Sequence, residues 1–543
     1  MASPSASNRE RGALTNAFIA ESSIQWRNEP RMMRSRRLYA QKKVLFWLGS
    51  SWRKTVLPKR VNDAIWKRAN DVLSCEEHER QINSDASPFE QNIKVPDGFR
   101  VRMGGLWLIE LFPSSLSDAL LKQLDKSGWD GVHAYAVNRD SNSEKAREAR
   151  AKENIGWWRL GHDVDKGFHG FAPNAVSLDL PHGFESVEYN AIQIGSSLTA
   201  ISAFFSPTEE LRTKLDAEWH AEHEPILLKQ RGKRPRALSR RENDMRATQL
   251  ARNEAYEKAR NWLARRCGGF FSRNKLKTPA ADLLLFEGFD PTTEMMGEDY
   301  RNAGRALGLD SAFHWVSTEM PNLAAFPFDE LHSDFDFIGI VGNKGNAVKP
   351  IAKHLAMYGN DEERAIAYHY ARHVQDILLQ ICVVNYSKSM LELYAKRRDV
   401  ACREYKRHSL KKTEGLRFEI LTDSLDIKEA FHDASMLWEP TWRKWNGLED
   451  LRLTESPELR SRGDKSANLE VDLLKKLKNT ANDNFKLLLE RDSTYRDILA
   501  TASSIGADIA SERLSRIAII VALISLGVAI VTLCSPLICE RQR

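Results

Sequence analysis

Two histidines and a glutamate with helical spacing are the side chains best suited to hold a metal ion. His220, His223 and Glu224 share one face of the helix expected over 218–224, because residues three and four apart are neighbours on a helix. Imidazole and carboxylate groups are common zinc ligands. The order of these residues departs from the HExxH and HxxEH patterns, so a metal-dependent hydrolase would lack its general base at the usual place. Exposed polar residues on a helix explain the same pattern.

Two further histidine groups and one glycine-rich segment invite a chemical interpretation. His369 and His373 are four residues apart without the glutamate of a metalloprotease, and His162 lies beside Asp163 in a glycine-rich stretch. The segment 337–345 runs from an apolar strand into glycines and a lysine, but its spacing does not match GxxxxGK[ST]. It therefore predicts a buried strand that ends in a turn. The sequence shows no nucleophile or kinase motif, so we expect a protein that binds rather than catalyses, and we predict no cofactor.

A basic segment near the amino terminus predicts an anionic partner. Between residues 26 and 68 thirteen lysines and arginines stand against Glu29 and Asp63, with tryptophan and phenylalanine interleaved among them. The candidate contact residues are Arg34, Arg36, Arg37, Lys42 and Lys43. Basic and aromatic side chains together suit the surface of an anionic lipid bilayer, or less readily the bases and phosphates of nucleic acid. The alternative is an amphipathic arm folded onto the core with its basic face in water.

The composition is that of a globular protein kept in a reducing compartment. Of the 543 residues 42% are hydrophobic and 28% are charged, with a net charge of +6. The six cysteines form no CxxC pair, which argues against a zinc knuckle or a disulfide framework. The amino terminus shows no apolar core of a secretory signal, so we expect most of the chain to remain cytoplasmic.

The middle of the chain predicts an α+β domain over 91–275. Two stretches, beginning at Phe99 and Tyr189, each predict a strand, a glycine-containing turn, a second strand and a helix, with the turns at Gly104-Gly105 and Gly195-Ser196. The second helix has the start signal Ser206-Pro207-Thr208-Glu209. We therefore expect a basic, mostly helical arm over 1–90, two similar units within 91–275, and an α/β extension over 276–355.

Two long helices are expected after this region. Apolar residues recur at helical spacing from Glu362 to about Arg407, within a segment 356–465 that holds this helix and a connection. A second helical pattern over 466–516 predicts a stalk with one apolar seam, interrupted by Asn484 and Arg491. The two polar positions either fix the register of a self-associating coiled coil or pack against a neighbour in the same chain. We favour the second interpretation, with the two helices as an antiparallel pair.

The chain closes on an uncharged apolar run from Ile517 to Cys539 that predicts one C-terminal transmembrane helix. At about 1.5 Å per residue the run would extend roughly 35 Å, enough to cross a hydrocarbon core of about 30 Å. Arg513 and Arg516 before it balance the two arginines after it, so charge does not set its orientation. The missing secretory signal predicts a single-pass membrane protein with its bulk cytoplasmic.

This order of an α/β domain, paired long helices and a stalk that enters a membrane helix resembles magnesium channels of the CorA type in layout. That family has two membrane helices with a Gly-Met-Asn signature between them, and this chain ends where the signature would stand, so no permeation residue carries over. The leading hypothesis is a membrane-tethered cytoplasmic sensor or scaffold with an unknown ligand, able to form homo-oligomers through the stalk and terminal helix. The alternatives are an oligomeric channel or transporter subunit and a membrane-anchored metal-dependent hydrolase.

Overall fold

The computed structural model divides the chain into two compact units. Unit 1 comprises Met1–Asn385 and Asp433–Asn479, and unit 2 comprises Tyr386–His432 and Thr480–Arg543. The residues that the structure describes are 58–64, 66–67, 94–130, 140–153, 155–168, 175–221, 226–228, 236–238, 240–293, 302–304, 306–309, 313–327, 337–406, 410–439, 448–455 and 472–539. Arg34, Arg36, Arg37, Lys42 and Lys43 therefore lie outside the described residues, as do His223 and Glu224.

Unit 1 is built on a mixed sheet that holds ten of the described strands. Their order across the sheet is β12-β9-β10-β11-β8-β1-β5-β4-β2-β3. The bounds are β1 Arg100–Phe112, β2 Gly156–Asp165, β3 Ala175–Leu178, β4 Phe184–Ile194, β5 Leu198–Pro207, β8 Ala280–Glu287, β9 Phe313–Val316, β10 Leu323–Pro327, β11 Phe337–Asn343 and β12 Arg452–Glu455. The pairs β8–β11 and β2–β3 are parallel and the others are antiparallel. A separate hairpin joins β6 (Ile226–Leu228) and β7 (Arg236–Leu238).

Helices complete the two units. Their bounds are α5 Ser117–Lys126, α6 Asn142–Ala151, α7 Glu209–His220, α8 Arg240–Cys267, α9 Phe270–Arg273, α11 Lys344–Val348, α12 Glu362–Lys406, α13 Leu410–Met436 and α16 Leu473–Cys539, with the 3-10 helices η2 Ser114–Leu116 and η3 Lys349–Tyr358. The long helix expected from Glu362 to about Arg407 is confirmed as α12. The short helices α9 and α11 both place polar groups against the sheet.

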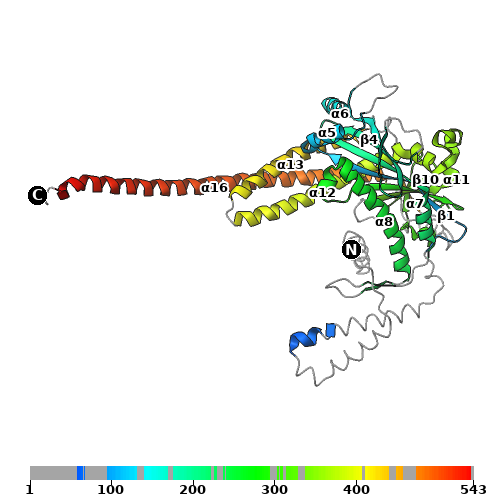
Figure 1. The fold of residues 1–543 in the computed structure, drawn as a ribbon, viewed down its shortest axis with the longest axis horizontal. Helices are drawn as coiled ribbons and strands as arrows, with labels where there is room; N and C mark the ends of the chain where they lie inside the picture. The colour runs from blue at the N-terminus through cyan, green and yellow to red at the C-terminus, as the bar shows by residue number, and fades with distance from the viewer. Residues whose placement is uncertain are drawn as a thin grey trace, which may run out of the picture. The chain divides into compact units, whose positions relative to one another are not determined.

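The central strands are buried on both faces. Alternate residues of a strand point to opposite sides, and Leu106 and Leu108 of β1 join a buried cluster with Leu215 of α7 and Leu263 of α8. Both helices lie beside β1 (Figure 1). On the opposite face Trp107 packs against Phe204 of β5, with ring centroids 4.8 Å apart, and Phe204 packs against Tyr368 of α12 at 5.1 Å. The first turns of α12 therefore cover the second face of the sheet.

The predicted fold class, an α+β domain followed by long helices and one C-terminal transmembrane helix, is contradicted. One large mixed sheet takes strands from the region 276–355 and, through β12, from residue 452 onward. The expected turn at Gly104-Gly105 is absent: β1 runs through it with a register shift between Met103 and Gly105. A Cβ on Gly104 would lie 2.8 Å from a methyl carbon of Leu283, so glycine serves close approach between strands there rather than a turn.

The turn expected at Gly195 is present and joins β4 to β5. Gly195 has φ +57°, a left-handed conformation that favours glycine. The Asp433 carboxylate, near the end of α13, lies where a Cβ of Gly195 would stand, and accepts hydrogen bonds from the Ser197 backbone N–H (2.6 Å) and hydroxyl (2.5 Å). This contact ties the carboxyl-terminal turn of α13 to the hairpin, and all three residues belong to unit 1.

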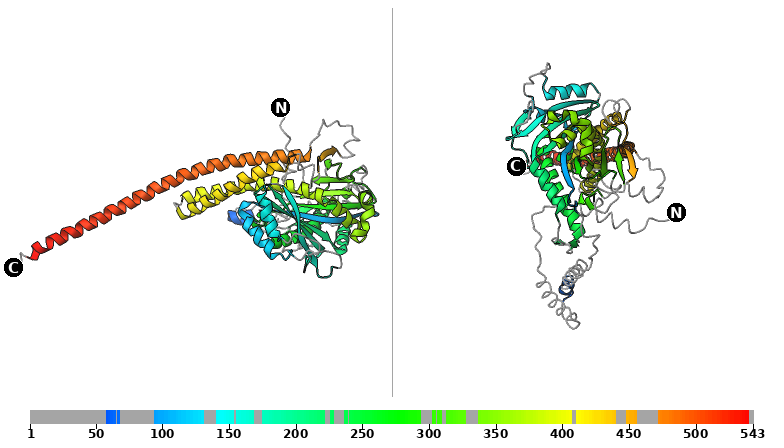
Figure 2. Two further views of the ribbon diagram at one scale, coloured as in Figure 1. Left: turned by 90° about the horizontal axis from the view of Figure 1, so that it is seen from above. Right: turned by 90° about the vertical axis from the view of Figure 1, so that its right-hand side faces the viewer.

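Unit 2 contains three long helical segments, residues 386–406 of α12, 410–432 of α13 and 480–539 of α16 (Figure 2). Asn484 of α16 donates to the Ser387 hydroxyl of α12 (3.1 Å), and Tyr394 of α12 donates to Asp492 of α16 (3.2 Å). Because both residue numbers rise together, α12 and α16 are parallel, and the expected antiparallel pairing is wrong. The helix α13 connects α12 to α16 by running back along them. Its Ser424 hydroxyl also donates a hydrogen bond to Asp492 (2.8 Å). The Asn484 contact agrees with a seam packed within the chain.

The prediction of a transmembrane helix over 517–539, and with it a single-pass membrane location, is contradicted. The run lies within α16, but no helix in the described part of the chain is apolar over a length that would cross a membrane.

Candidate functional site

Three helices of unit 1 begin close to the first residues of β1, and each start is fixed by a local cap. The Thr208 hydroxyl accepts from the Leu211 N–H at α7 (3.2 Å), the Asn343 side chain accepts from the Asn346 N–H at α11 (2.9 Å), and Asp361 accepts from the Arg364 N–H at α12 (2.9 Å). Helix amino termini carry partial positive charge. Acidic side chains are therefore stabilised where the three helices begin.

Eight charged side chains meet there in a network that we call the ion-pair cluster. They are Arg102, Glu209, Arg212, Glu287, Lys344, Asp361, Glu362 and Glu363. Lys344 follows β11 and Glu287 ends the parallel neighbour β8. The carboxyl ends of parallel strands are the usual place for ligands in open α/β sheets. The cluster thus occupies the part of the sheet where a binding function is most expected.

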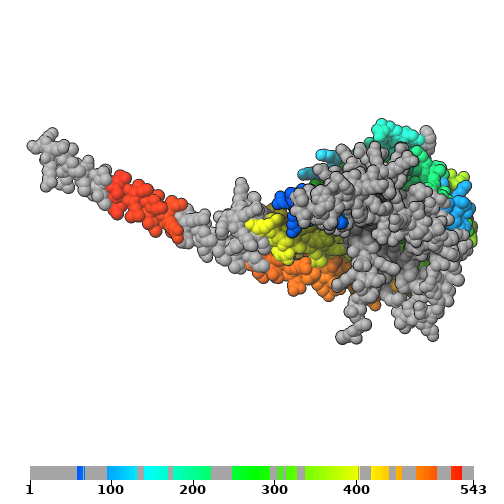
Figure 3. Space-filling model, turned by 90° about the horizontal axis from the view of Figure 1, so that it is seen from below, coloured from blue at the N-terminus to red at the C-terminus, as the bar shows by residue number. Residues whose placement is uncertain are grey.

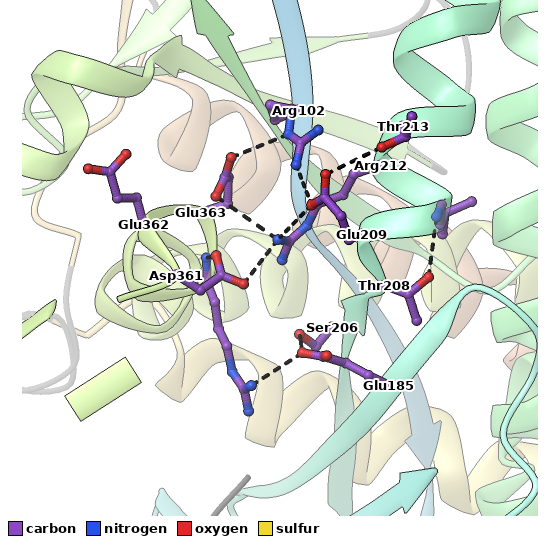
Figure 4. Close-up of polar contacts among 12 residues, drawn as sticks. Arg102, Glu185, Ser206, Thr208, Glu209, Arg212, Thr213, Asp361, Glu362 and Glu363 are labelled. Carbon is purple, nitrogen blue, oxygen red and sulfur yellow. Dashed lines mark hydrogen bonds and ion pairs between the residues drawn. The ribbon is translucent and has the colours of Figure 1, made fainter. Parts of the chain in front are cut away.

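Glu363 is the hub of this cluster. Its Oε1 atom lies 3.3 Å from Nε of Arg102 and 3.0 Å from Nζ of Lys344. Lys344 reaches two further carboxylates, at 2.8 Å for Glu287 and 3.2 Å for Glu362. Arg102 also pairs with Glu209, which extends the network to α7 (Figure 4). A strand and three helix starts are therefore joined through one buried carboxylate.

The cluster keeps its members ionised. Burial alone would raise the pKa of Glu363, but its backbone hydrogen bond and the ammonium of Lys344 outweigh burial and hold that pKa at about 2. Burial likewise opposes the charge of Lys344, yet hydrogen bonds to Glu287 and Glu363 raise its pKa well above the usual value. Proton transfer near neutral pH requires a group whose pKa lies near the working pH. These residues are suited to permanent ion pairs and not to acid–base catalysis.

Arg212 is the least satisfied member of the cluster. Its side chain is only 5% exposed, and Nη1 lies 3.0 Å from Asp361 Oδ2, with Glu209 at 3.9 Å and Glu363 at 4.0 Å. Figure 4 shows the guanidinium directed between these carboxylates. Within the described residues its Nε and Nη2 atoms have no hydrogen-bond partner. The attraction of three carboxylates therefore holds a buried cation that forms one close ion pair.

A second buried carboxylate, Glu110 of β1, fixes the start of α9. It accepts hydrogen bonds from the backbone N–H groups of Phe271 and Ser272, each at 3.1 Å, from the Ser272 hydroxyl, and from the Thr278 hydroxyl at 3.3 Å. Burial raises the pKa of Glu110 to about 7 against the opposing effect of these donors. The side chain is fully enclosed by protein and holds the α8–α9 turn to the sheet, which is a structural task.

A third polar contact pins α8 to the sheet. Arg252 donates from Nε and Nη2 to the two oxygens of Asp282 on β8, at 2.6 and 2.7 Å, and from Nη1 to the Leu307 carbonyl at 2.9 Å. Arg252 and Asp282 are both almost fully buried. A bidentate pair of this kind has well-defined geometry and loses much stability when one partner is removed.

Of the three residues His220, His223 and Glu224, proposed from sequence for metal binding, the structure describes only His220. His220 ends α7, and its two ring nitrogens face backbone carbonyls, Nδ1 at 2.7 Å from Asp216 O and Nε2 at 2.9 Å from Phe99 O. Its proposed partners His223 and Glu224 lie outside the described residues. The described part of the chain contains no group of three histidine, cysteine or acidic side chains arranged to hold a metal ion.

His162 and Asp163, from a second sequence candidate, make contacts within unit 1. His162 lies 3.1 Å from Glu188 on the neighbouring strand, and Asp163 accepts from Trp129, Tyr189 and Arg266 in the core. The strand predicted in the segment 337–345 is confirmed as β11, but helix α11 follows it in place of the expected turn. Sequence reasoning did not single out the partners of Lys344. The acidic start of α12 was the one local signal that pointed to them.

The comparisons with known proteins leave the geometry as the guide to function. No protein-family model matches the chain, and no curated protein matches it.

Proposed function

We propose that this chain is a non-catalytic binding protein that uses its basic amino-terminal segment to contact a phosphate-bearing surface. The ion-pair cluster supports the first part of this proposal. Lys344, Arg102 and Glu363 are held in their ionised forms by one another, and a group so fixed is a poor proton donor or acceptor at neutral pH. The cluster joins elements of unit 1 into a rigid support.

The single observation that supports the binding partner is the exposed surface of the described part of the basic segment. A helical turn begins at Pro58, whose carbonyl accepts from the Val61 and Asn62 N–H groups. Lys59, Arg60 and Lys67 are exposed on it. Val61 is 45% exposed and Trp66 is 36% exposed beside these cations. Cations next to exposed apolar groups suit a phosphate-rich surface with an apolar or stacking component.

The shared chemistry is the phosphate group, and lipid headgroups and nucleic-acid backbones both present it. The sequence places further cations before the helical turn, at Arg34, Arg36 and Arg37. Each basic side chain near an anionic surface contributes about 1 kcal/mol. Reversing all three is therefore expected to weaken binding by more than about a hundredfold.

The test measures the full-length chain against two probes. These are vesicles of phosphatidylcholine with phosphatidylserine, assayed by co-sedimentation, and a duplex oligonucleotide, assayed by fluorescence anisotropy. The variant carries Arg34→Glu, Arg36→Glu and Arg37→Glu. The matched control reverses three exposed cations elsewhere in unit 1, with Lys122→Glu, Lys126→Glu and Arg147→Glu.

The outcomes separate the two sources of phosphate. Binding to vesicles alone or to the oligonucleotide alone, lost in the variant and kept in the control, identifies the partner. Equal loss in variant and control would mean that net charge and not the segment is responsible. No binding of the unmodified chain to either probe, or unchanged binding of the variant, would leave the folded-arm interpretation and overturn the proposal.

A further inference from the structure

The end of α16 presents an apolar surface that its own unit leaves uncovered. Seven large aliphatic side chains fall within 517–526, and each is between 55 and 61% exposed. They are Ile517, Ile519, Ile520, Val521, Leu523, Ile524 and Leu526. We call these residues the apolar end segment. Figure 3 shows its visible face in red. A patch of several hundred Å² of exposed apolar surface marks an interaction site in proteins.

The large apolar side chains cover more than one stripe of the helix. Successive residues of an α-helix are turned by about 100°, so the seven positions cover an arc of about 220°, and Ala518, Ala522 and Ser525 occupy the rest of the circumference. The apolar stripe of a helix that packs against one neighbouring surface is about 100° wide. A single packing partner would therefore leave part of this arc in water, which indicates a bundle of three or more helices.

The neighbouring helices of unit 2 end before they reach this segment. Tyr394 of α12 meets Asp492 of α16, and the two helices are parallel. The helix α12 ends twelve residues later at Lys406, level with about residue 504 of α16. At about 1.5 Å per residue, Ile517 lies roughly 20 Å beyond that point. The described helices of this chain are therefore too short to cover the apolar end segment.

A second copy of the same chain is the partner that fits. Between Arg516 and Glu540 the sequence has no charged residue, so equivalent segments packed side by side bring no like charges together. Copies in a symmetric assembly also present this surface at the same level. A second exposed apolar stripe, Phe418, Leu421 and Leu425 on α13, lies in the same unit with helical spacing i, i+3 and i+7.

From these observations we infer that copies of this chain associate through the apolar end segment of α16 into a bundle of at least three helices. This inference is independent of the phosphate-binding proposal, because the basic segment and the apolar end segment share no residue. Failure of one experiment leaves the other unaffected.

The test is the molar mass of the full-length chain by light scattering and sedimentation velocity over a range of concentrations. The variant places charge in the interface with Ile520→Glu and Leu523→Glu. The control, Ser493→Glu with Thr494→Glu, adds the same charge at exposed positions of the same helix. Because all four positions are exposed, the fold is expected to be retained, and circular dichroism checks this.

The expected result is an oligomer of at least three copies for the unmodified chain and for the control. The interface variant should dissociate at concentrations at least about a hundredfold higher, since it loses two buried aliphatic contacts. A monomeric unmodified chain, including a monomer that carries bound lipid or detergent, would overturn the inference. An oligomer that the interface variant leaves intact would overturn it as well.

Discussion

The effect on stability of replacing Glu110 by glutamine should change sign with pH. The replacement should destabilise the chain at low pH and stabilise it at high pH. The pKa of Glu110 rises from 4.5 to about 7 on folding because the carboxyl is buried. The folded chain therefore holds this proton more tightly than the unfolded chain. The resulting stabilisation is complete below pH 4.5 and is lost as the pH rises through about 7.

The magnitude follows from the size of this shift. A shift of 2.5 pH units corresponds to roughly 3 kcal/mol in the free energy of unfolding. The glutamine variant does not titrate, but its amide N–H₂ meets the Phe271 N–H donor, which costs about 1 kcal/mol at every pH. The variant is therefore expected to be about 1 kcal/mol less stable near pH 4 and about 2 kcal/mol more stable near pH 8.

The assay is urea unfolding of the full chain from pH 4 to pH 8, followed by tryptophan fluorescence. Glu148→Gln, at a carboxylate that is 57% exposed, serves as the control and should leave the pH dependence of the unmodified chain unchanged. Parallel curves for the unmodified chain and Glu110→Gln across this range would refute the claim that Glu110 takes up a proton on folding.

Three further predictions concern the contacts that hold unit 1 together. Glu363→Gln should lower the free energy of unfolding at pH 7 by about 3 kcal/mol. The free energy of unfolding should also fall less steeply between pH 4.5 and pH 2 in this variant, because the native carboxylate has the depressed pKa. Urea unfolding that shows the same pH dependence for the variant and the unmodified chain in this range would contradict the prediction. Arg252→Met should lower the free energy of unfolding by about 3–5 kcal/mol. The double variant Arg252→Met with Asp282→Leu should lose clearly less, since the second change removes the unpaired carboxylate. Additive losses of stability in a double-mutant cycle would contradict this prediction. Gly195→Ala should lower the melting temperature by several degrees, because φ +57° is strained for alanine and the Asp433 carboxylate occupies the space of its Cβ; calorimetry showing no decrease would contradict it.

The sequence predicted what local patterns determine. The helix from Glu362 was visible because its apolar spacing persists over 45 residues. The signal Ser206-Pro207-Thr208-Glu209 placed the start of α7 to within two residues, but the cap is Thr208, and Pro207 ends β5 instead of opening the helix. The turn at Gly195 follows from the residue type that a left-handed backbone favours.

Long-range pairing was not predictable in this way. Arg102 and Glu363 are 261 positions apart in the sequence, and no local pattern around either residue predicts an ion pair between them. The strand β12 joins the far edge of the sheet although it is only four residues long, and no periodicity develops over that length. The parallel arrangement of α12 and α16 depends on the return through α13, whereas two long helices in sequence suggested an antiparallel pair.

The error at the carboxyl terminus has a different origin. A hydropathy profile depends only on the sequence of residues along one chain. It does not indicate whether lipid or protein contacts an apolar segment. The same residues that suggested a membrane span, Ile517 onward, form the exposed end of a 67-residue helix. Composition alone does not distinguish packing against lipid from packing against other helices.

The salt dependence of the dissociation constant tests the proposed function most directly. For a duplex probe, the slope of log Kd against log salt concentration reports about 0.9 per phosphate contacted. The account predicts a steep slope for the full-length chain and a slope lower by about 2.7 when Arg34, Arg36 and Arg37 carry glutamate. If lipid is the partner, vesicle binding by the unmodified chain should also depend more steeply on salt concentration than vesicle binding by the variant. Equal slopes for the unmodified chain and the variant would contradict the assignment of phosphate binding to this segment.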